Sequence, residues 1–182
     1  MRTFISLNPA PATKQKILEI QEKVRSGISE INAEFLKFIK WESEDKFHMT
    51  LFFIGDINAN QCHVIDSCLL DVKKELSIKE INFSAAGISA FPKLRFPGVI
   101  IIELKDEDKR AFDLSEKINH CMKESGFFQD KSFRPHLTLG RVKRDKKLNL
   151  TELKDISIEL NFSVESFYFM ESKLKSSGSE YS

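Results

Sequence analysis

Two short histidine-containing segments of this 182-residue chain carry the residues best suited to chemistry. The first contains His48 and Thr50, and the second contains His136 and Thr138, so each has the pattern His-x-Thr. Alternate side chains of an extended strand point to the same face, which places each imidazole beside a hydroxyl. We therefore interpret each segment as a strand that presents an acid–base group and a hydrogen-bond donor over one sheet surface.

Two such pairs supply what the cleavage of a phosphodiester requires. An imidazole has an unperturbed pKa of ~6.5, so it can take up or release a proton near neutrality. In-line attack at phosphorus needs one proton removed from the incoming oxygen and one given to the leaving oxygen. If His48 and His136 face each other across a cleft, they provide both operations. The hydroxyls of Thr50 and Thr138 can then donate hydrogen bonds to the non-bridging oxygens.

Arg141 and the basic segment 142–147 follow the second motif closely. Arg141 lies an odd number of residues beyond Thr138, so an ideal strand would turn it to the opposite face. Only a bend after Gly140 would bring it to the site. The basic segment could bind phosphate at the edge of the site, although a solvated loop is the more common role of a short charge run.

Other residues that could do chemistry have simpler interpretations. His63 and His120 fall in expected helices without a partner motif, so we expect structural or solvent-facing roles. Phe47 and Phe133 stand next to the histidine strands and could stack a base. Burial is the more common role of such residues, and we expect it here.

Composition excludes several classes of protein. Lysines and arginines number 28 against 27 acidic residues, a formal net charge of +1, so no global field draws the chain to nucleic acid or membrane. RNA would have to bind at a local site. The N-terminal apolar run is too short for a signal sequence or a membrane span.

The three cysteines, Cys62, Cys68 and Cys121, are odd in number and show no C-x-x-C spacing. This pattern argues against both a disulfide framework and a zinc site. A reduced, cytoplasmic compartment fits it best, and we expect a cytoplasmic monomer.

The order of the expected elements repeats along the chain. The pattern is strand, helix, His-x-Thr strand, connection and a strand beginning with Asn-Phe-Ser, first over about 3–91 and then over about 99–170. The expected elements are strands at 3–7, 48–54, 81–91, 99–104, 133–141 and 160–169 and helices at 13–27, 59–76 and 106–126. Thr13 is the expected N-cap of the first helix, Gly27 its stop, and Gly87 a kink in a strand.

This repetition predicts one α+β domain over 1–182, built from two pseudo-symmetric lobes. No flexible linker separates the halves, so a tandem of independent domains is disfavoured. The pseudo-symmetry would bring His48 and His136 together.

The residues described so far resemble the 2H phosphoesterase superfamily, and within it the LigT-like RNA 2′,3′-cyclic phosphodiesterases, also called 2′-5′ RNA ligases. The resemblance covers nearly the whole chain in an ordered set of motifs: Arg2-x-Phe4, His48-x-Thr50-Leu51-x-Phe53-x-Gly55, Phe91-Pro92, Pro135-His136-x-Thr138-Leu139-x-Arg141, Ser172-x-Leu174, Gly178 and Tyr181. It implies a bilobal fold in which two antiparallel sheets line a central cleft and helices pack outside.

The resemblance also implies an activity and roles for individual residues. The implied reaction is hydrolysis of RNA 2′,3′-cyclic phosphate ends to 2′-phosphates, without metal or other cofactor. By this analogy His48 is the proton donor to the leaving 3′ oxygen, and His136 is the proton acceptor that activates water. Thr50 and Thr138 would hold the phosphate. Arg141 would contact it, and the partners would be RNA ends or small nucleotides with a 2′,3′-cyclic phosphate.

Three alternatives remain open at this point. The same residues could serve a 2′-5′ RNA ligase or a 2′,5′-oligonucleotide phosphodiesterase. A non-catalytic module that binds RNA ends could retain the fold, although intact His and Thr in both motifs speak against it. A zinc protein that uses the four histidines is the most remote of these alternatives.

Overall fold

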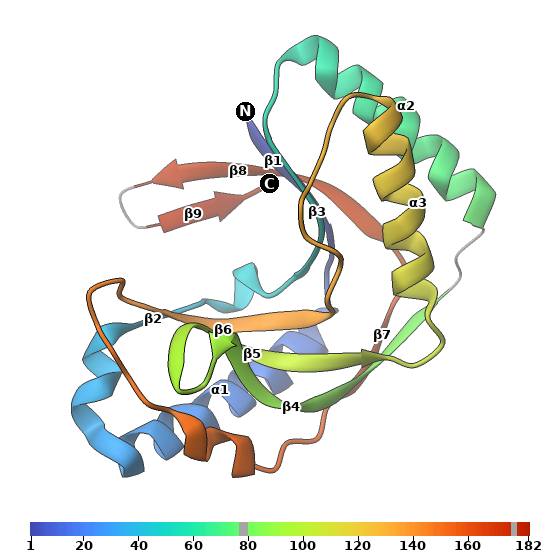
Figure 1. Ribbon diagram of the computed structural model, residues 1–182. Helices are drawn as coiled ribbons and strands as arrows, with labels where there is room; N and C mark the ends of the chain where they lie inside the picture. The colour runs from blue at the N-terminus through green and yellow to red at the C-terminus, as the bar shows by residue number, and fades with distance from the viewer. Residues whose placement is uncertain (77–79, 176–177) are drawn as a thin grey trace.

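Residues 1–76, 80–175 and 178–182 are described by the computed structural model, which is a mixed helix and sheet structure (Figure 1). In chain order its elements are β1 (Arg2–Leu7), α1 (Pro11–Asn32), the 3-10 helix η1 (Ala33–Phe38), β2 (Ile39–Trp41), η2 (Glu44–Lys46), β3 (Met49–Asp56), α2 (Ala59–Leu76), β4 (Ile81–Lys93), β5 (Phe96–Asp106), α3 (Arg110–Glu124), β6 (His136–Val142), η3 (Thr151–Asp155), β7 (Asn161–Val164), β8 (Phe167–Lys175) and β9 (Gly178–Tyr181).

Two antiparallel sheets form the framework. One has the strand order β3-β1-β8-β9, and the other has the order β2-β6-β5-β4-β7. Figure 1 shows the sheets in separate halves of the molecule, with α2 and α3 outside the first and α1 outside the second. The predicted α+β fold with two antiparallel sheets is confirmed.

Neither sheet is built from one half of the sequence. The first sheet joins β1 and β3 to β8, which comes from the second half of the chain. The second sheet joins β5 and β6 to β4, which comes from the first half. The duplication of 3–91 and 99–170 stays a prediction. If it is right, the two copies exchange a strand and are not separate lobes.

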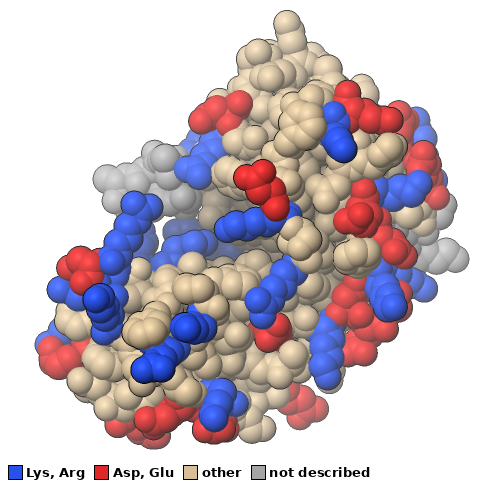
Figure 2. Space-filling model, in the orientation of Figure 1, with Lys and Arg blue, Asp and Glu red and all other residues tan. Residues whose placement is uncertain are grey.

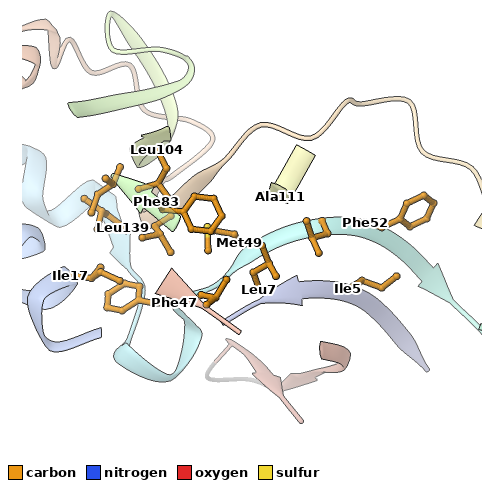
Figure 3. Packing of buried hydrophobic residues seen from close by; sticks show 14 of the residues in the cluster. Ile5, Leu7, Ile17, Phe47, Met49, Phe52, Phe83, Leu104, Ala111 and Leu139 are labelled. Carbon is orange, nitrogen blue, oxygen red and sulfur yellow. The ribbon is translucent and has the colours of Figure 1, made fainter. Parts of the chain in front are cut away.

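A single hydrophobic core connects the two sheets. Leu7 and Met49 from the first sheet belong to the same cluster of buried residues as Phe83 and Leu139 from the second (Figure 3). Phe47, just before β3, is only 1% exposed, so its predicted burial is confirmed. Continuous packing of this kind holds the two sheets in a fixed relation to each other.

The first helix differs from the expectation at both ends. It begins at Pro11, with Ala10 as the N-cap, so the prediction of Thr13 as the cap was wrong. Proline suits this first position because its missing N–H would have no partner there. Gly27 does not end the helix. A Cβ there would lie 2.7 Å from Cδ1 of Ile156, so this glycine allows close packing on the segment after η3.

Strand β4 contains the predicted kink. Gly87 has a φ of 142°, and the pairing with β5 shifts register between Ala85 and Gly87. The third helix begins at Arg110, later than the expected residue 106. Asp106 ends β5, and its carboxylate accepts a hydrogen bond of 2.8 Å from the backbone N–H of Phe112 in the first turn.

The cysteines also differ from the expectation. Cys68 of α2 and Cys121 of α3 form a disulfide with a Cα–Cα distance of 5.9 Å, although the odd number and the spacing of the cysteines argued against a disulfide framework. The two residues are 53 positions apart, and only the side-by-side packing of the two helices brings them together. Cys62 is a free thiol. Within the described residues, no helix has the length and apolar character needed to cross a membrane. The monomeric state and cytoplasmic location stay predictions.

Candidate active site

The second His-x-Thr motif lies within a strand, as expected, whereas in the first motif His48 immediately precedes the strand that contains Thr50. Strand β3 begins directly after His48, and β6 begins at His136. Leu137 and Leu139 are fully buried, whereas His136 and Thr138 are half-buried, so the two faces of the strand separate as the pattern predicts. The same alternation holds around Thr50 in β3. In each motif the apolar side chains thus lie in the core, and the polar side chains lie on the opposite face of the strand.

The polar faces of the two motifs meet in one cavity of about 520 Å³. Figure 2 shows lysine and arginine side chains gathered around a hollow between the two parts of the molecule. The lining side chains are those of Arg2, Phe4, Lys40, Glu42, Lys46, His48, Thr50, Phe53, His136, Thr138, Arg141, Ser172 and Tyr181. All five residues predicted for the site therefore lie in the same cavity.

Each histidine is held by the same backbone contact. Nδ1 of His48 lies 2.7 Å from the carbonyl oxygen of Lys46, and Nδ1 of His136 lies 2.7 Å from that of Arg134. A carbonyl oxygen only accepts hydrogen bonds, so Nδ1 carries the proton in each ring. Nε2 is then the nitrogen left to exchange protons with a ligand.

Aromatic rings pack against both imidazoles. Phe4 of β1 and Tyr181 of β9 lie at centroid distances of 4.9 and 5.2 Å from His48. Phe91 of β4 meets the His136 ring edge-on at 4.9 Å. These contacts restrict the ring orientations. The His-x-Thr pattern did not predict a role in the site for Phe4, Phe91 or Tyr181. Only their place in the family resemblance could have indicated one.

Burial lowers the pKa of both histidines. The pKa of His48 falls to about 4, because desolvation outweighs the hydrogen bond to the Lys46 carbonyl, and the nearby His136 adds to the decrease. The pKa of His136 is lowered in the same direction, again chiefly by burial. Both imidazoles are therefore neutral near pH 7 when no ligand is bound.

A bulge in β6 turns Arg141 toward the site. Thr138 and Gly140 pair with consecutive residues of β5, so Leu139 is an extra residue without a partner. A bulge of this kind shifts the alternation by one position and brings Arg141 to the face of the motif. The expected bend exists, but it lies before Gly140 and not after it.

Strand β3 contains a bulge at the equivalent place. Its pairing with β1 skips Leu51, which follows the first motif as Leu139 follows the second. Phe53 lies five residues after His48, as Arg141 lies five residues after His136, and its side chain also lines the cavity. The guanidinium of Arg2 stacks over the Phe53 ring at 5.0 Å. The two sides of the cavity thus share a geometry but present different groups.

Arg141 is anchored by a carboxylate. Its Nε donates a hydrogen bond of 2.9 Å to Oε1 of Glu42, whose side chain is only 13% exposed. This bond leaves four N–H groups on the terminal nitrogens of the guanidinium. Glu42 directly follows β2, which pairs with β6. No motif in the sequence indicated this residue.

Gln21 of α1 binds the backbone beside Arg141 and Glu42 from the buried side of the sheet. Its side-chain amide donates hydrogen bonds of 2.9 Å to the carbonyl oxygens of Glu42 and Leu139. Gln21 is 4% exposed and lies among the buried residues of the helix. The sequence signal that could have identified Gln21 is its position within the apolar stripe of the helix, because a buried amide needs hydrogen-bond partners.

The remaining histidines lie elsewhere. His63 is in α2, and His120 in α3 lies 3.4 Å from Glu124. In the described parts of the chain, no three His, Cys, Asp or Glu side chains are placed so that they could hold a metal ion.

Comparisons with known proteins agree with this geometry. Residues 4–177 match the family described as "AKAP7 2'5' RNA ligase-like domain". The chain is 30% identical to the RNA 2',3'-cyclic phosphodiesterase of Archaeoglobus fulgidus over 171 residues, which cover 94% of this chain and 86% of that protein. It is 28% identical to the RNA 2',3'-cyclic phosphodiesterase of Thermotoga maritima over 144 residues, which cover 79% and 71%.

Solved structures share the fold. A protein of Thermus thermophilus superposes with a TM-score of 0.76 at 22% identity, over all of this chain and 94% of that one. E. coli LigT complexed with 3'-AMP superposes with a TM-score of 0.69 at 16% identity, over all of this chain and 93% of that one. At these identities the structural likeness establishes the fold alone.

Proposed function

The chain belongs to the AKAP7 2'5' RNA ligase-like domain family, within the 2H phosphoesterase superfamily, and we propose that it hydrolyses RNA 2′,3′-cyclic phosphate ends to 2′-phosphates by His/His acid–base catalysis without metal. One observation carries the proposal. Two imidazoles from different sheets enter one cavity, and each holds its Nδ1 proton on a backbone carbonyl so that Nε2 can act on a ligand. The names of the relatives agree with the reaction.

In the proposed reaction His136 accepts a proton from water through Nε2, and the water oxygen bonds to phosphorus. The bond from phosphorus to the 3′ oxygen breaks on the opposite side, and His48 protonates that oxygen. The product carries a 2′-phosphate and a free 3′-hydroxyl. The hydroxyls of Thr50 and Thr138 and the guanidinium of Arg141 would bind the non-bridging oxygens as their charge increases.

The protonation states set a condition on this mechanism. A proton donor must be charged before it acts, yet burial keeps the pKa of His48 at about 4 in the free protein. A bound phosphodiester anion favours the imidazolium, because an opposite charge within a few ångströms raises the pKa of a histidine. Substrate binding would thus prepare the acid. The lowered pKa of His136 suits a base that is neutral in the free enzyme.

The test is the loss of activity in His48→Ala and His136→Ala. The substrate is a short oligonucleotide that ends in a 2′,3′-cyclic phosphate, and each variant should lose about 10²-fold or more in kcat/KM. His120→Ala, in an exposed histidine of α3, is the matched control. Retention of full activity by either cavity variant would rule out the mechanism, and tight binding without turnover by the parent protein would indicate a binding module.

The family description supports a second candidate that uses the same residues, a 2′-5′ RNA ligase or 2′,5′-phosphodiesterase. Both reactions need the same in-line displacement at phosphorus. Incubation with cyclic-ended RNA and with a linear 2′-5′ dinucleotide, followed by product analysis, distinguishes them. We expect 2′-phosphate from the cyclic substrate to be the faster product.

A further inference from the structure

A second cavity of about 640 Å³ adjoins the proposed active site. Lys40 and Arg141 line both cavities, so the two are contiguous at the β2–β6 edge of the second sheet. We call this second cavity the basic groove. One of its walls is formed by the end of β4 and the start of β5, on either side of the turn that joins them. The other is the segment after β6. Figure 1 shows these two segments beside each other at the same end of the sheet.

The charge of the basic groove is strongly one-sided. Among the residues that the structure describes, its lining includes no acidic side chain and six cationic ones: Lys40, Arg141, Lys143, Arg144, Lys146 and Lys147. Asp145 pairs with Lys146 at 3.0 Å, and Glu42 pairs with Arg141. Lys143, Arg144 and Lys147 are exposed. The chain as a whole has a net charge of +1, so this concentration is local.

The groove also has an exposed aromatic side chain. Phe96, at the start of β5, is 51% exposed and lines the groove. The cationic groups of Lys93 and Arg95 each lie 5.6 Å from its ring centroid. An exposed aromatic ring among cations is the combination on which single-stranded nucleic acid stacks its bases and places its phosphates.

Backbone contacts hold the two walls together. Lys143 donates a hydrogen bond of 2.9 Å to the carbonyl of Phe38, and Lys146 donates one of 3.0 Å to the carbonyl of Lys143. Leu150 donates one of 2.9 Å to the carbonyl of Leu94, in the turn between β4 and β5. These contacts attach the segment to η1 at Lys143 and to the turn between β4 and β5 at Leu150.

We propose that the basic groove binds the RNA strand on the 5′ side of the cyclic phosphate, with a base stacked on Phe96 and backbone phosphates beside Lys143, Arg144 and Lys147. The inference rests on the proposed function. A 2′,3′-cyclic phosphate is by its chemistry the 3′ end of a strand, so all other nucleotides lie on its 5′ side. A strand whose end occupies the active site can continue into the groove past Lys40 and Arg141, which both cavities share. The favoured substrate class is then an oligonucleotide and not a mononucleotide.

The test compares kcat/KM for a 2′,3′-cyclic mononucleotide with that for a trinucleotide ending in a 2′,3′-cyclic phosphate. The parent protein should prefer the trinucleotide by about tenfold or more. In the variant Lys143→Ala/Arg144→Ala/Lys147→Ala that preference should disappear, while the mononucleotide rate stays unchanged. For the trinucleotide, the dependence of log(kcat/KM) on log[salt] should become shallower by about 1.4, since the strand has two phosphates besides the cyclic one and each single-strand phosphate contact contributes about 0.7.

A second variant tests the aromatic ring. Phe96→Ala should lower kcat/KM for the trinucleotide by about tenfold, whereas Phe96→Trp should retain it, because either ring can stack on a base. The matched control is Lys16→Ala/Lys105→Ala/Lys123→Ala, which removes three exposed lysines that line neither cavity. This control should leave both substrates unaffected.

Binding separates a failure of this inference from a failure of the proposed function. A labelled trinucleotide with a 3′-phosphate is titrated into the parent protein and into the variant Lys143→Ala/Arg144→Ala/Lys147→Ala, here called the groove variant. This binding measurement needs no catalysis. Weaker binding by the groove variant supports the groove even if no cyclic phosphate is hydrolysed. Equal binding by both proteins, or equal loss of rate on both substrates, would overturn it. Equally effective competition by a poly-glutamate peptide of the same charge would also overturn it and would indicate an acidic protein partner.

Discussion

The side-chain amide of Gln21 donates a hydrogen bond of 2.9 Å to the carbonyl oxygen of Leu139, the extra residue of the bulge in β6. The same carbonyl also accepts a bond of 2.9 Å from the backbone N–H of Glu42. A buried residue of α1 thus fixes the bulge that turns Arg141 to the site. It also holds the backbone of Glu42, the residue that anchors Arg141.

Gln21→Leu should destabilise the protein and weaken the site. Leucine keeps similar volume but leaves the carbonyl of Glu42 without its amide donor and removes one donor from that of Leu139, at a cost of about 1–3 kcal/mol. Urea unfolding measures this cost, and the KM for a cyclic substrate should rise because Arg141 is less well placed. Gln15→Leu, at an exposed position of α1, is the control. Equal effects of the two substitutions would contradict the positioning role.

Arg141→Ala should weaken the binding of inorganic phosphate. Loss of hydrogen bonds from a charged guanidinium costs about 1.5–3 kcal/mol, or roughly 10- to 100-fold in Kd. Calorimetric titration with phosphate measures the change, and Arg141→Lys should recover part of it because a lysine keeps the charge without the planar fork. Lys123→Ala on α3 serves as the control. An unchanged Kd in Arg141→Ala would show that the guanidinium does not contact the anion.

His48 should make the protein less stable in acid. Its pKa is about 4 when folded and ~6.5 when unfolded, so between these values the unfolded chain binds more protons. Its contribution is fully present above pH 6.5 and is lost as the pH falls toward 4, by about 3 kcal/mol in total. Urea unfolding at a series of pH values measures it. His48→Asn retains a donor for the Lys46 carbonyl and should show a shallower dependence; parallel curves for the two proteins would disprove the effect.

Phosphate should raise the pKa of His48. An anion in the cavity favours the imidazolium, and an opposite charge at such a distance shifts a pKa by about 1–3 units. Titration of the imidazole Cε1–H resonance by NMR, with and without saturating phosphate, measures the shift. His120, exposed on α3, provides an internal control whose resonance should not respond to phosphate. An unaltered pKa for His48 would contradict the proposal that substrate binding protonates this histidine.

The disulfide predicts the number of reactive thiols. Protein unfolded without reductant should react with a thiol reagent at one site, Cys62, and after reduction at three. A cross-link between residues 53 positions apart stabilises a chain by about 4 kcal/mol through loop entropy, so reduction should lower the urea midpoint. Three thiols before reduction would show that Cys68 and Cys121 are not joined.

The sequence was sufficient for the local chemistry of the site. Strand alternation alone placed His48 with Thr50 and His136 with Thr138, because the period of two is a property of any extended chain. The repeated order of elements indicated that the two motifs belong together. Burial of Phe47 and the kink at Gly87 were likewise local matters of side-chain type and backbone freedom.

The tertiary structure decided what depends on pairing between distant segments. The bulge at Leu139 exists only in the register of β6 against β5, so no pattern within the motif could place Arg141. Glu42 reaches Arg141 across 99 residues and Gln21 reaches Leu139 across 118, contacts that spacing along the chain does not reveal. The pairing of β8 with β1 in the first sheet and of β4 with β5 in the second has the same origin. The packing of one shared core, and not the order of elements, selects which strands become neighbours.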